Sequence, residues 1–179
     1  MINSDGKNFY SPSMLKKYLS CKHIIFNEKY EKDLKLKRQP NTIVDEIMFD
    51  KGNIHEKQYF EKLKKKFSKV KDIKNLKNVD KFKETLKAMQ QGFEVIYGGW
   101  LTDGKWRGES DFLEINFKRH SNFGNYSYTV IDTKNSNKIK GDHIYQVGVY
   151  CDLLKKIQGV FPEKFYILLK NNKKEEVKL

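Results

Sequence analysis

The stretch YSYTVIDTKN, residues 126–135, contains the strand on which the predicted fold depends. Residues 128–131 are β-branched or aromatic, which is typical of a buried strand. Asp132 and Lys134 then follow one residue apart, so both side chains point to the same side of an extended chain. A strand that simply ends in water would also carry charges, and Asp-x-Lys recurs elsewhere in this lysine-rich chain. Those other copies are Asp5/Lys7, Asp33/Lys35, Asp72/Lys74 and Asp103/Lys105, and none of them follows a long apolar strand.

The composition favours a polyanionic partner inside the cell. The 179 residues include 36 Lys and Arg against 23 Asp and Glu, a net charge of +13. Such a surplus suits nucleic acid or an anionic membrane, although the lysine, asparagine and isoleucine bias of an AT-rich genome gives the same composition. Cys21 and Cys151 form no CxxC pair, which fits a reducing, cytoplasmic setting. No stretch resembles a signal peptide or a membrane span, so we expect no membrane partner.

The periodicity predicts alternating helices and strands in a single domain, with a helical extension over residues 1–42 and a core over 43–170. Helices are expected from Pro12 with Ser11 as N-cap, over about 43–67 with Thr42 or Asn41 as N-cap, from Asp80 to Gly92, and over 142–158 before Gly159. Strands are expected over about 93–101 and 106–117, joined by Asp103-Gly104, then in the opening stretch and over 164–170. A strand meander followed by a crossover helix and a further strand predicts an α/β fold with a central mixed sheet flanked by helices.

Several polar side chains fall at points where this layout can bring them together. Asp111 lies in the second hairpin strand, and pairing with the next strand could place it beside Asp132. A solvated strand residue is the alternative, which the neighbouring Phe112 and Leu113 disfavour. Paired carboxylates suit Mg²⁺ or Mn²⁺. His55 on the long helix could add a nitrogen ligand, although a helical histidine is more often structural or exposed.

The helix over 142–158 carries a polar pair. Gln146 and Tyr150 are four residues apart and share one face. They can orient ligands or a phosphate beside a metal site, or they can be ordinary polar residues at a helix edge.

Together these motifs resemble the PD-(D/E)XK nuclease superfamily, and most closely its RecB-like exonuclease branch, which includes CRISPR-associated exonucleases and the nuclease parts of helicase-nuclease fusions. The segments that carry the resemblance are GNIHE with His55, GESDF with Asp111, VIDTK with Asp132 and Lys134, and QVGVY with Gln146 and Tyr150. The first helix, SPSMLKKYLSCKH, and AMQQGFEVIYGGWL also fit the order, so the resemblance covers about Phe9 to Lys170. It implies a restriction-endonuclease-like core.

The resemblance also implies an activity and a site. His55, Asp111, Asp132 and the carbonyl of Thr133 would hold Mg²⁺ or Mn²⁺. Lys134 would position water and stabilise charge at the phosphate, with Gln146 and Tyr150 maintaining the geometry. The expected function is a divalent-metal-dependent DNA nuclease, an exonuclease on single-stranded or end-containing DNA, acting in DNA repair, recombination or defence.

Two departures from the branch qualify this expectation. Many members hold an iron–sulfur cluster with four cysteines, but here only Cys21 occupies a matching position and no cysteine follows Cys151, so no cluster is expected. Relatives also often continue into a helicase or further nuclease segment, so two alternatives stay open: a stand-alone nuclease, or the front of a longer protein with a helicase in cis or in trans. A catalytically inactive nucleic-acid-binding module of the same fold is the alternative, and RNA is not excluded as the ligand.

Overall fold

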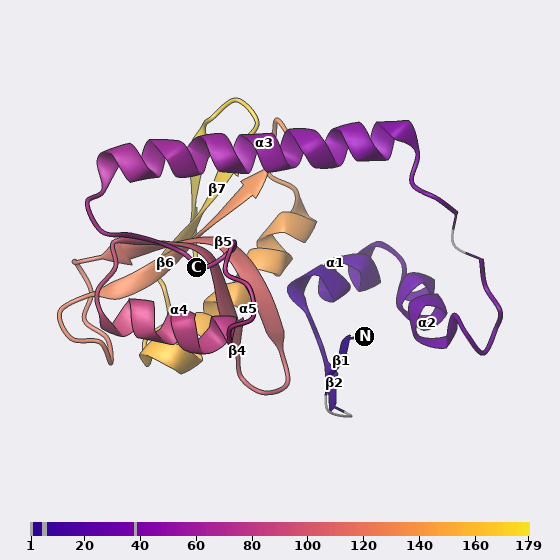
Figure 1. The fold of residues 1–179 in the computed structure, drawn as a ribbon, viewed down its shortest axis with the longest axis horizontal. Coiled ribbons are helices and arrows are strands. Elements are labelled where there is room, and N and C mark those ends of the chain that lie inside the picture. Colours follow the sequence, from indigo (N-terminus) through magenta and orange to yellow (C-terminus); the bar gives the residue numbers. More distant parts are fainter. Residues whose placement is uncertain (1, 5–6, 38) are drawn as a thin grey trace.

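The structure, a computed structural model, describes residues 2–4, 7–37 and 39–179, with side chains from Phe9 onward except at position 38. Its centre is a mixed sheet in the order β3-β4-β5-β6-β7-β8, with helices on both faces (Figure 1). This arrangement confirms the predicted α/β class. The strands are β1 Ile2–Ser4, β2 Lys7–Phe9, β3 Val70–Asp72, β4 Val95–Thr102, β5 Arg107–Asn116, β6 Ser127–Lys134, β7 Lys164–Leu169 and β8 Lys174–Lys178. The helices are α1 Pro12–Ser20, α2 Lys22–Tyr30, α3 Ile43–Lys66, α4 Lys81–Gln90 and α5 Gly141–Gln158.

Helix boundaries follow the capping residues that the sequence offers. The hydroxyl of Ser11 accepts the N–H of Met14, with Pro12 in the first helical position of α1. Thr42 caps α3, and Asp45 completes a capping box by accepting the N–H of Thr42 at 2.9 Å. Gly159 ends α5 with a φ of 79°, a conformation that glycine adopts without a steric penalty. These local interactions account for the agreement between predicted and observed helix starts.

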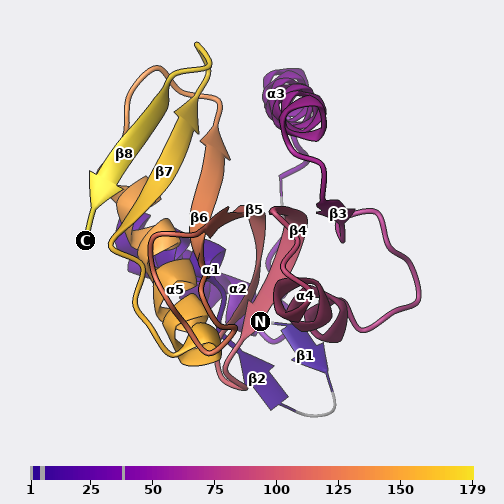
Figure 2. The same ribbon diagram turned by 90° about the vertical axis from the view of Figure 1, so that its left-hand side faces the viewer.

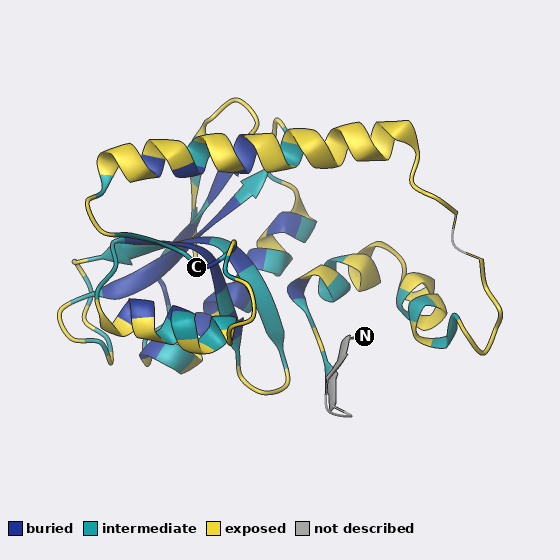
Figure 3. Ribbon diagram, viewed as in Figure 1, coloured by how far each residue is buried: buried dark blue, intermediate teal, exposed yellow. Residues whose placement is uncertain are grey.

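The sheet separates two apolar clusters. β6 is central, and its residues from Ser127 to Asp132 are buried. On one face α4 and α5 cover a large cluster that includes Leu113, Val130, Leu154 and Ile167. On the other face the C-terminal half of α3 packs over a smaller cluster of residues Phe60, Leu63, Val95, Tyr97, Phe112 and Ile131. Figure 3 shows that the N-terminal half of α3 is exposed.

The C-terminal strand β8 was not predicted from the sequence. β8 extends the sheet past residue 170 by pairing antiparallel with β7, although its sequence KEEVK is highly charged. An edge strand tolerates this composition because neither face needs full burial. Ile144, Val147, Cys151 and Leu154 recur at helical spacing in α5; the last three are buried, whereas Ile144 is 38% exposed. Of the helices in the described residues, none is both long and apolar enough to cross a membrane.

Candidate active site

The site is centred on the point where β5 and β6 separate. Their paired register runs from Asn116↔Ser127 to Phe112↔Ile131 and stops there. The Asp111 carboxylate occupies the gap that follows: its Oδ2 accepts the backbone N–H of Thr133 at 2.6 Å and the Thr133 hydroxyl at 2.7 Å. β6 meanwhile stays paired with β7 as far as Lys134↔Leu169. Asp111 is therefore fixed beside the end of β6, as the pairing of adjacent strands suggested.

β4 is distorted at the same level. Gly98, between the pairs Tyr97↔Phe112 and Gly99↔Ser110, has a φ of 68° and lies opposite Asp111. A Cβ at this position would lie 2.4 Å from the Cβ of Lys74, so both the backbone conformation and the close approach require glycine. Lys74 therefore packs directly against the backbone of Gly98. Its Nζ lies 2.5 Å from Glu56 Oε1.

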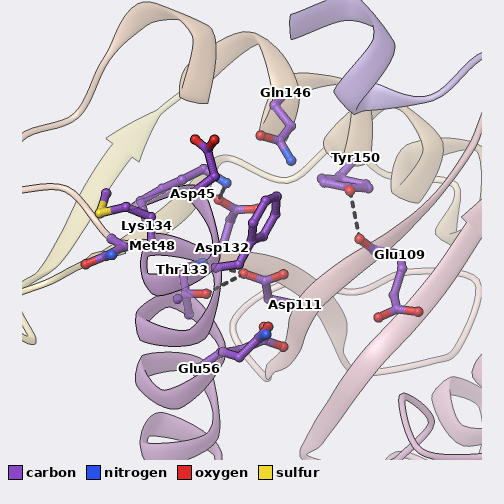
Figure 4. Close-up of a pocket in the computed structure, with 14 residues that line it drawn as sticks. Asp45, Met48, Glu56, Glu109, Asp111, Asp132, Thr133, Lys134, Gln146 and Tyr150 are labelled. Carbon is purple, nitrogen blue, oxygen red and sulfur yellow. Dashed lines mark hydrogen bonds and ion pairs between the residues drawn. The ribbon is translucent and has the colours of Figure 1, made fainter. Parts of the chain in front are cut away.

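Asp132 and Lys134 lie on one side of β6, as the alternation of a strand predicted. Asp132 is only 2% exposed, and the Lys134 ammonium contacts its Oδ2 as an ion pair (Figure 4). That oxygen nevertheless accepts no hydrogen bond of good geometry from the described residues. Desolvating a carboxylate is costly, and the ion pair with Lys134 offsets part of that cost.

The site concentrates negative charge. Burial, and then the neighbouring Asp111, raise the pKa of Asp132 to about 7, although Lys134 acts in the opposite direction. Burial alone would lower the pKa of Lys134, but Asp132 and Asp111 outweigh it and hold that pKa above its ordinary value. Burial and Asp111 also raise the pKa of Glu56. The carboxylates therefore repel one another, and a bound cation would relieve this repulsion.

α3 presents Glu56, not His55, to this pocket. Glu56 shares its helix face with Phe60 and Leu63, which are packed on the sheet, and so it lines the pocket together with Gly52. Successive residues of a helix are about 100° apart, so His55 projects in a different direction from Glu56. His55 does not line the pocket, but it is 7% exposed and its Nε2 is buried with no hydrogen-bond partner in the described part of the chain. Its proposed role as a ligand stays a prediction.

α5 contributes Gln146 and Tyr150, and both line the pocket. The Tyr150 hydroxyl donates to the backbone carbonyl of Glu109 at 2.7 Å, which fixes the ring beside β5. This contact depends on Gly108, where an added Cβ would lie 2.9 Å from both Tyr150 Cε1 and Pro12 Cδ. Burial, followed by the charges of Asp132 and Asp111, raises the pKa of Tyr150, so its hydroxyl stays protonated.

The result is a pocket of about 400 Å³ between α3, α5 and the ends of β5 and β6. Its lining residues are Asp45, Met48, Phe49, Gly52, Asn53, Glu56, Glu109, Asp111, Asp132, Thr133, Lys134, Asn135, Gln146 and Tyr150. Every predicted site residue except His55 is among them. Glu56 and Glu109 were missed as site residues, although both directly neighbour predicted motif residues in the sequence.

The donor set fits a hard divalent cation. Asp132 is a buried carboxylate, and Asp111 supplies a second carboxylate close enough to raise its pKa. In the described residues no group of three or more His, Cys, Asp or Glu side chains is arranged to hold a metal together. Mg²⁺ is usually bound by one or two carboxylates and keeps several waters or phosphate oxygens.

Comparisons with known proteins give no family for the chain, because neither a protein-family model nor a curated protein matches it.

Proposed function

We propose that this chain is a divalent-metal-dependent DNA nuclease of the PD-(D/E)XK superfamily, acting on single-stranded DNA or DNA ends. One observation carries the proposal: Asp111, Asp132 and Lys134, from two adjacent strands, converge on one open pocket in which the buried Asp132 carboxylate lies beside a second carboxylate and an ammonium. A purely structural ion pair would need neither the second carboxylate nor an open pocket. The order of the motifs and the mixed sheet support the same assignment.

Asp111 and Asp132 would hold Mg²⁺ or Mn²⁺, with the Thr133 carbonyl as a further ligand. A divalent cation bound there would supply Lewis acidity toward phosphate and water. The protein's own residues would do the rest. The hydrogen bonds from Thr133 fix the Asp111 carboxylate, while the Asp132 charge holds Lys134 protonated beside the pocket. An ammonium in that position would stabilise the negative charge that develops at the phosphate.

The surface charge would serve DNA binding. The net charge of +13 includes Lys64, Lys65 and Lys66 in the last turn of α3. Phosphate contacts release counterions, so log affinity for single-stranded DNA should fall against log salt with a slope of roughly −0.7 per phosphate contacted. A flat salt dependence would indicate that the charge reflects composition only.

The direct test is cleavage of end-labelled single- and double-stranded DNA, with Mg²⁺, with Mn²⁺ and with chelator. Parent protein should cleave only with metal, and Asp111→Asn and Asp132→Asn should each abolish cleavage. Asp152→Asn is a matched control, because Asp152 is an exposed carboxylate on α5 that pairs with Lys156 and does not line the pocket. DNA binding without cleavage under any metal condition would favour the inactive binding module instead. Selective cleavage of RNA would change the substrate.

A further inference from the structure

A second cavity lies on the other side of Glu109 from the active site. It measures about 490 Å³ and is formed by the start of α4, the loop before it, the end of β4, the start of β5 and Phe9 at the end of β2. Figure 2 shows the β1–β2 hairpin near the ends of β4 and α4. Tyr10, the residue after β2, is bound to the hairpin between β4 and β5. Its N–H donates to Lys105 O at 3.0 Å, and its carbonyl accepts from Arg107 N at 2.9 Å. These bonds place Phe9 at the cavity wall. The volume falls within the ~300–1,000 Å³ of small-ligand sites.

Arg107 gives this cavity an unused cationic donor. Its guanidinium carbon lies 4.4 Å from the centre of the Phe9 ring, a stacking contact that holds the planar group in place. Its Nε is buried and donates to no partner within the described residues. Buried donors of this kind normally have an acceptor. The acceptor that a fixed guanidinium best suits is a phosphate or another planar oxygen group.

Two further aromatic rings, besides Phe9, line the same cavity. Trp100 is fixed, because its indole Nε1 donates to Glu109 Oε2 at 2.7 Å. Phe82, in the first turn of α4, is a second aromatic wall and is partly exposed. Aromatic rings beside a cation are the standard means of binding unpaired bases, since every base can stack whatever its sequence.

Glu109 joins this cavity to the active site. It lines the first pocket and is the cross-strand partner of Trp100, which lines the second. The Lys81 ammonium, also in the second cavity, lies 3.8 Å from Glu109 Oε2. A strand held at Asp111 and Asp132 could therefore continue past Glu109 into the second cavity.

We infer that the second cavity is a subsite for a nucleotide of single-stranded DNA next to the cleaved bond. Its base would stack against Trp100 or Phe82, and Arg107 would bind its phosphate or a base carbonyl. This inference rests on the proposed function, since it extends the path of the DNA strand beyond the active site.

The test is an abasic scan. Oligothymidylates of about eight nucleotides, within the ~4–16 of single-strand binding sites, would each carry one abasic position, stepped along the strand. Affinity is measured in chelator, so that no cleavage occurs. A stacking subsite predicts that one position weakens binding to the parent by about 5- to 150-fold, equivalent to ~1–3 kcal/mol for one stacked base.

Variants test whether the base missing at that abasic position normally binds in the second cavity. In Phe82→Ala or Trp100→Ala, the loss of affinity caused by that abasic position should become smaller or disappear. The intact oligonucleotide should bind these variants more weakly than it binds the parent. Arg107→Gln should weaken binding to every oligonucleotide in the set. Arg119→Gln is the matched control, because Arg119 lies beyond the opposite end of β5 and pairs with Glu163. Thermal unfolding establishes whether each variant is folded. If Trp100→Ala does not fold, Phe82→Ala alone provides the test.

The outcomes separate the two proposals. If parent protein cleaves DNA but the abasic profile is the same in Phe82→Ala, the subsite is refuted and the nuclease function stands. If the profile changes as expected but no metal supports cleavage, the cavity binds DNA and the nuclease function fails. If Arg107→Gln binds as tightly as Arg119→Gln, Arg107 is not part of the subsite.

Discussion

Replacing Asp132 with asparagine should stabilise the metal-free protein, although it removes a residue that we place in the active site. Asparagine resembles the protonated carboxylic acid in shape and carries no charge. In the folded protein the charged form is disfavoured by burial and by Asp111, more than Lys134 can offset. The substitution should therefore remove an unfavourable charge that the native protein keeps for a cation.

The size of the effect follows from the pKa of Asp132, which rises from 3.8 to about 7 on folding. Each pKa unit corresponds to ~1.4 kcal/mol, so Asp132→Asn should gain up to ~4 kcal/mol at pH 8. Because the folded-state pKa is the higher one, the parent has its full stability below about pH 4. As the pH rises from about 4 toward about 7, ionisation of Asp132 lowers the free energy of unfolding of the parent. Above about pH 7 this decrease stays constant. The advantage of the variant should shrink accordingly on acidification.

Urea unfolding of both proteins with chelator, at pH 5 and pH 8, measures this difference. Added Mn²⁺ should stabilise the parent and leave Asp132→Asn unchanged, since ligands that bind only the folded state raise its stability. Asp152→Asn, at an exposed position, should change stability by no more than ~0.5 kcal/mol. A variant less stable than the parent at pH 8 without metal would refute the reasoning, because the Asp132 charge would then stabilise the fold.

Lys134→Ala should lower the cleavage rate by ~10²–10⁴-fold while DNA affinity in chelator changes little, and an unchanged rate would remove the lysine from the mechanism. Gly52→Ala should raise the free energy of unfolding in urea by ~0.5–1 kcal/mol, because a Cβ there meets nothing within 4 Å and alanine favours the helix. A lower free energy of unfolding would contradict a continuous α3. Gly108→Ala should destabilise the protein by ~1–3 kcal/mol, because its Cβ would lie 2.9 Å from Tyr150, and an unchanged midpoint would show that Tyr150 is free to move. Purified protein should show no visible iron–sulfur absorbance, since two cysteines are too few for a cluster, and stoichiometric iron and sulfide would overturn this.

The sequence alone determined the features that depend on near neighbours along the chain. Ser11, Thr42 and Asp80 start helices because a side-chain oxygen needs only the N–H groups two or three residues ahead. Asp103-Gly104 predicted the hairpin between β4 and β5 for a similar reason. The shared side of Asp132 and Lys134 followed from the alternation of side chains in a strand.

Only the tertiary structure decided which distant side chains share the pocket. Nothing local to Asp111 shows that it accepts the N–H of Thr133; that bond exists because β5 and β6 separate after Phe112↔Ile131. The rotation of α3 was likewise set by Phe60 and Leu63 packing on the sheet, which places Glu56, and not His55, in the lining of the pocket. Capping and alternation act over a few residues, whereas helix rotation and strand separation minimise exposed apolar surface across the whole sheet, and no short segment contains that information.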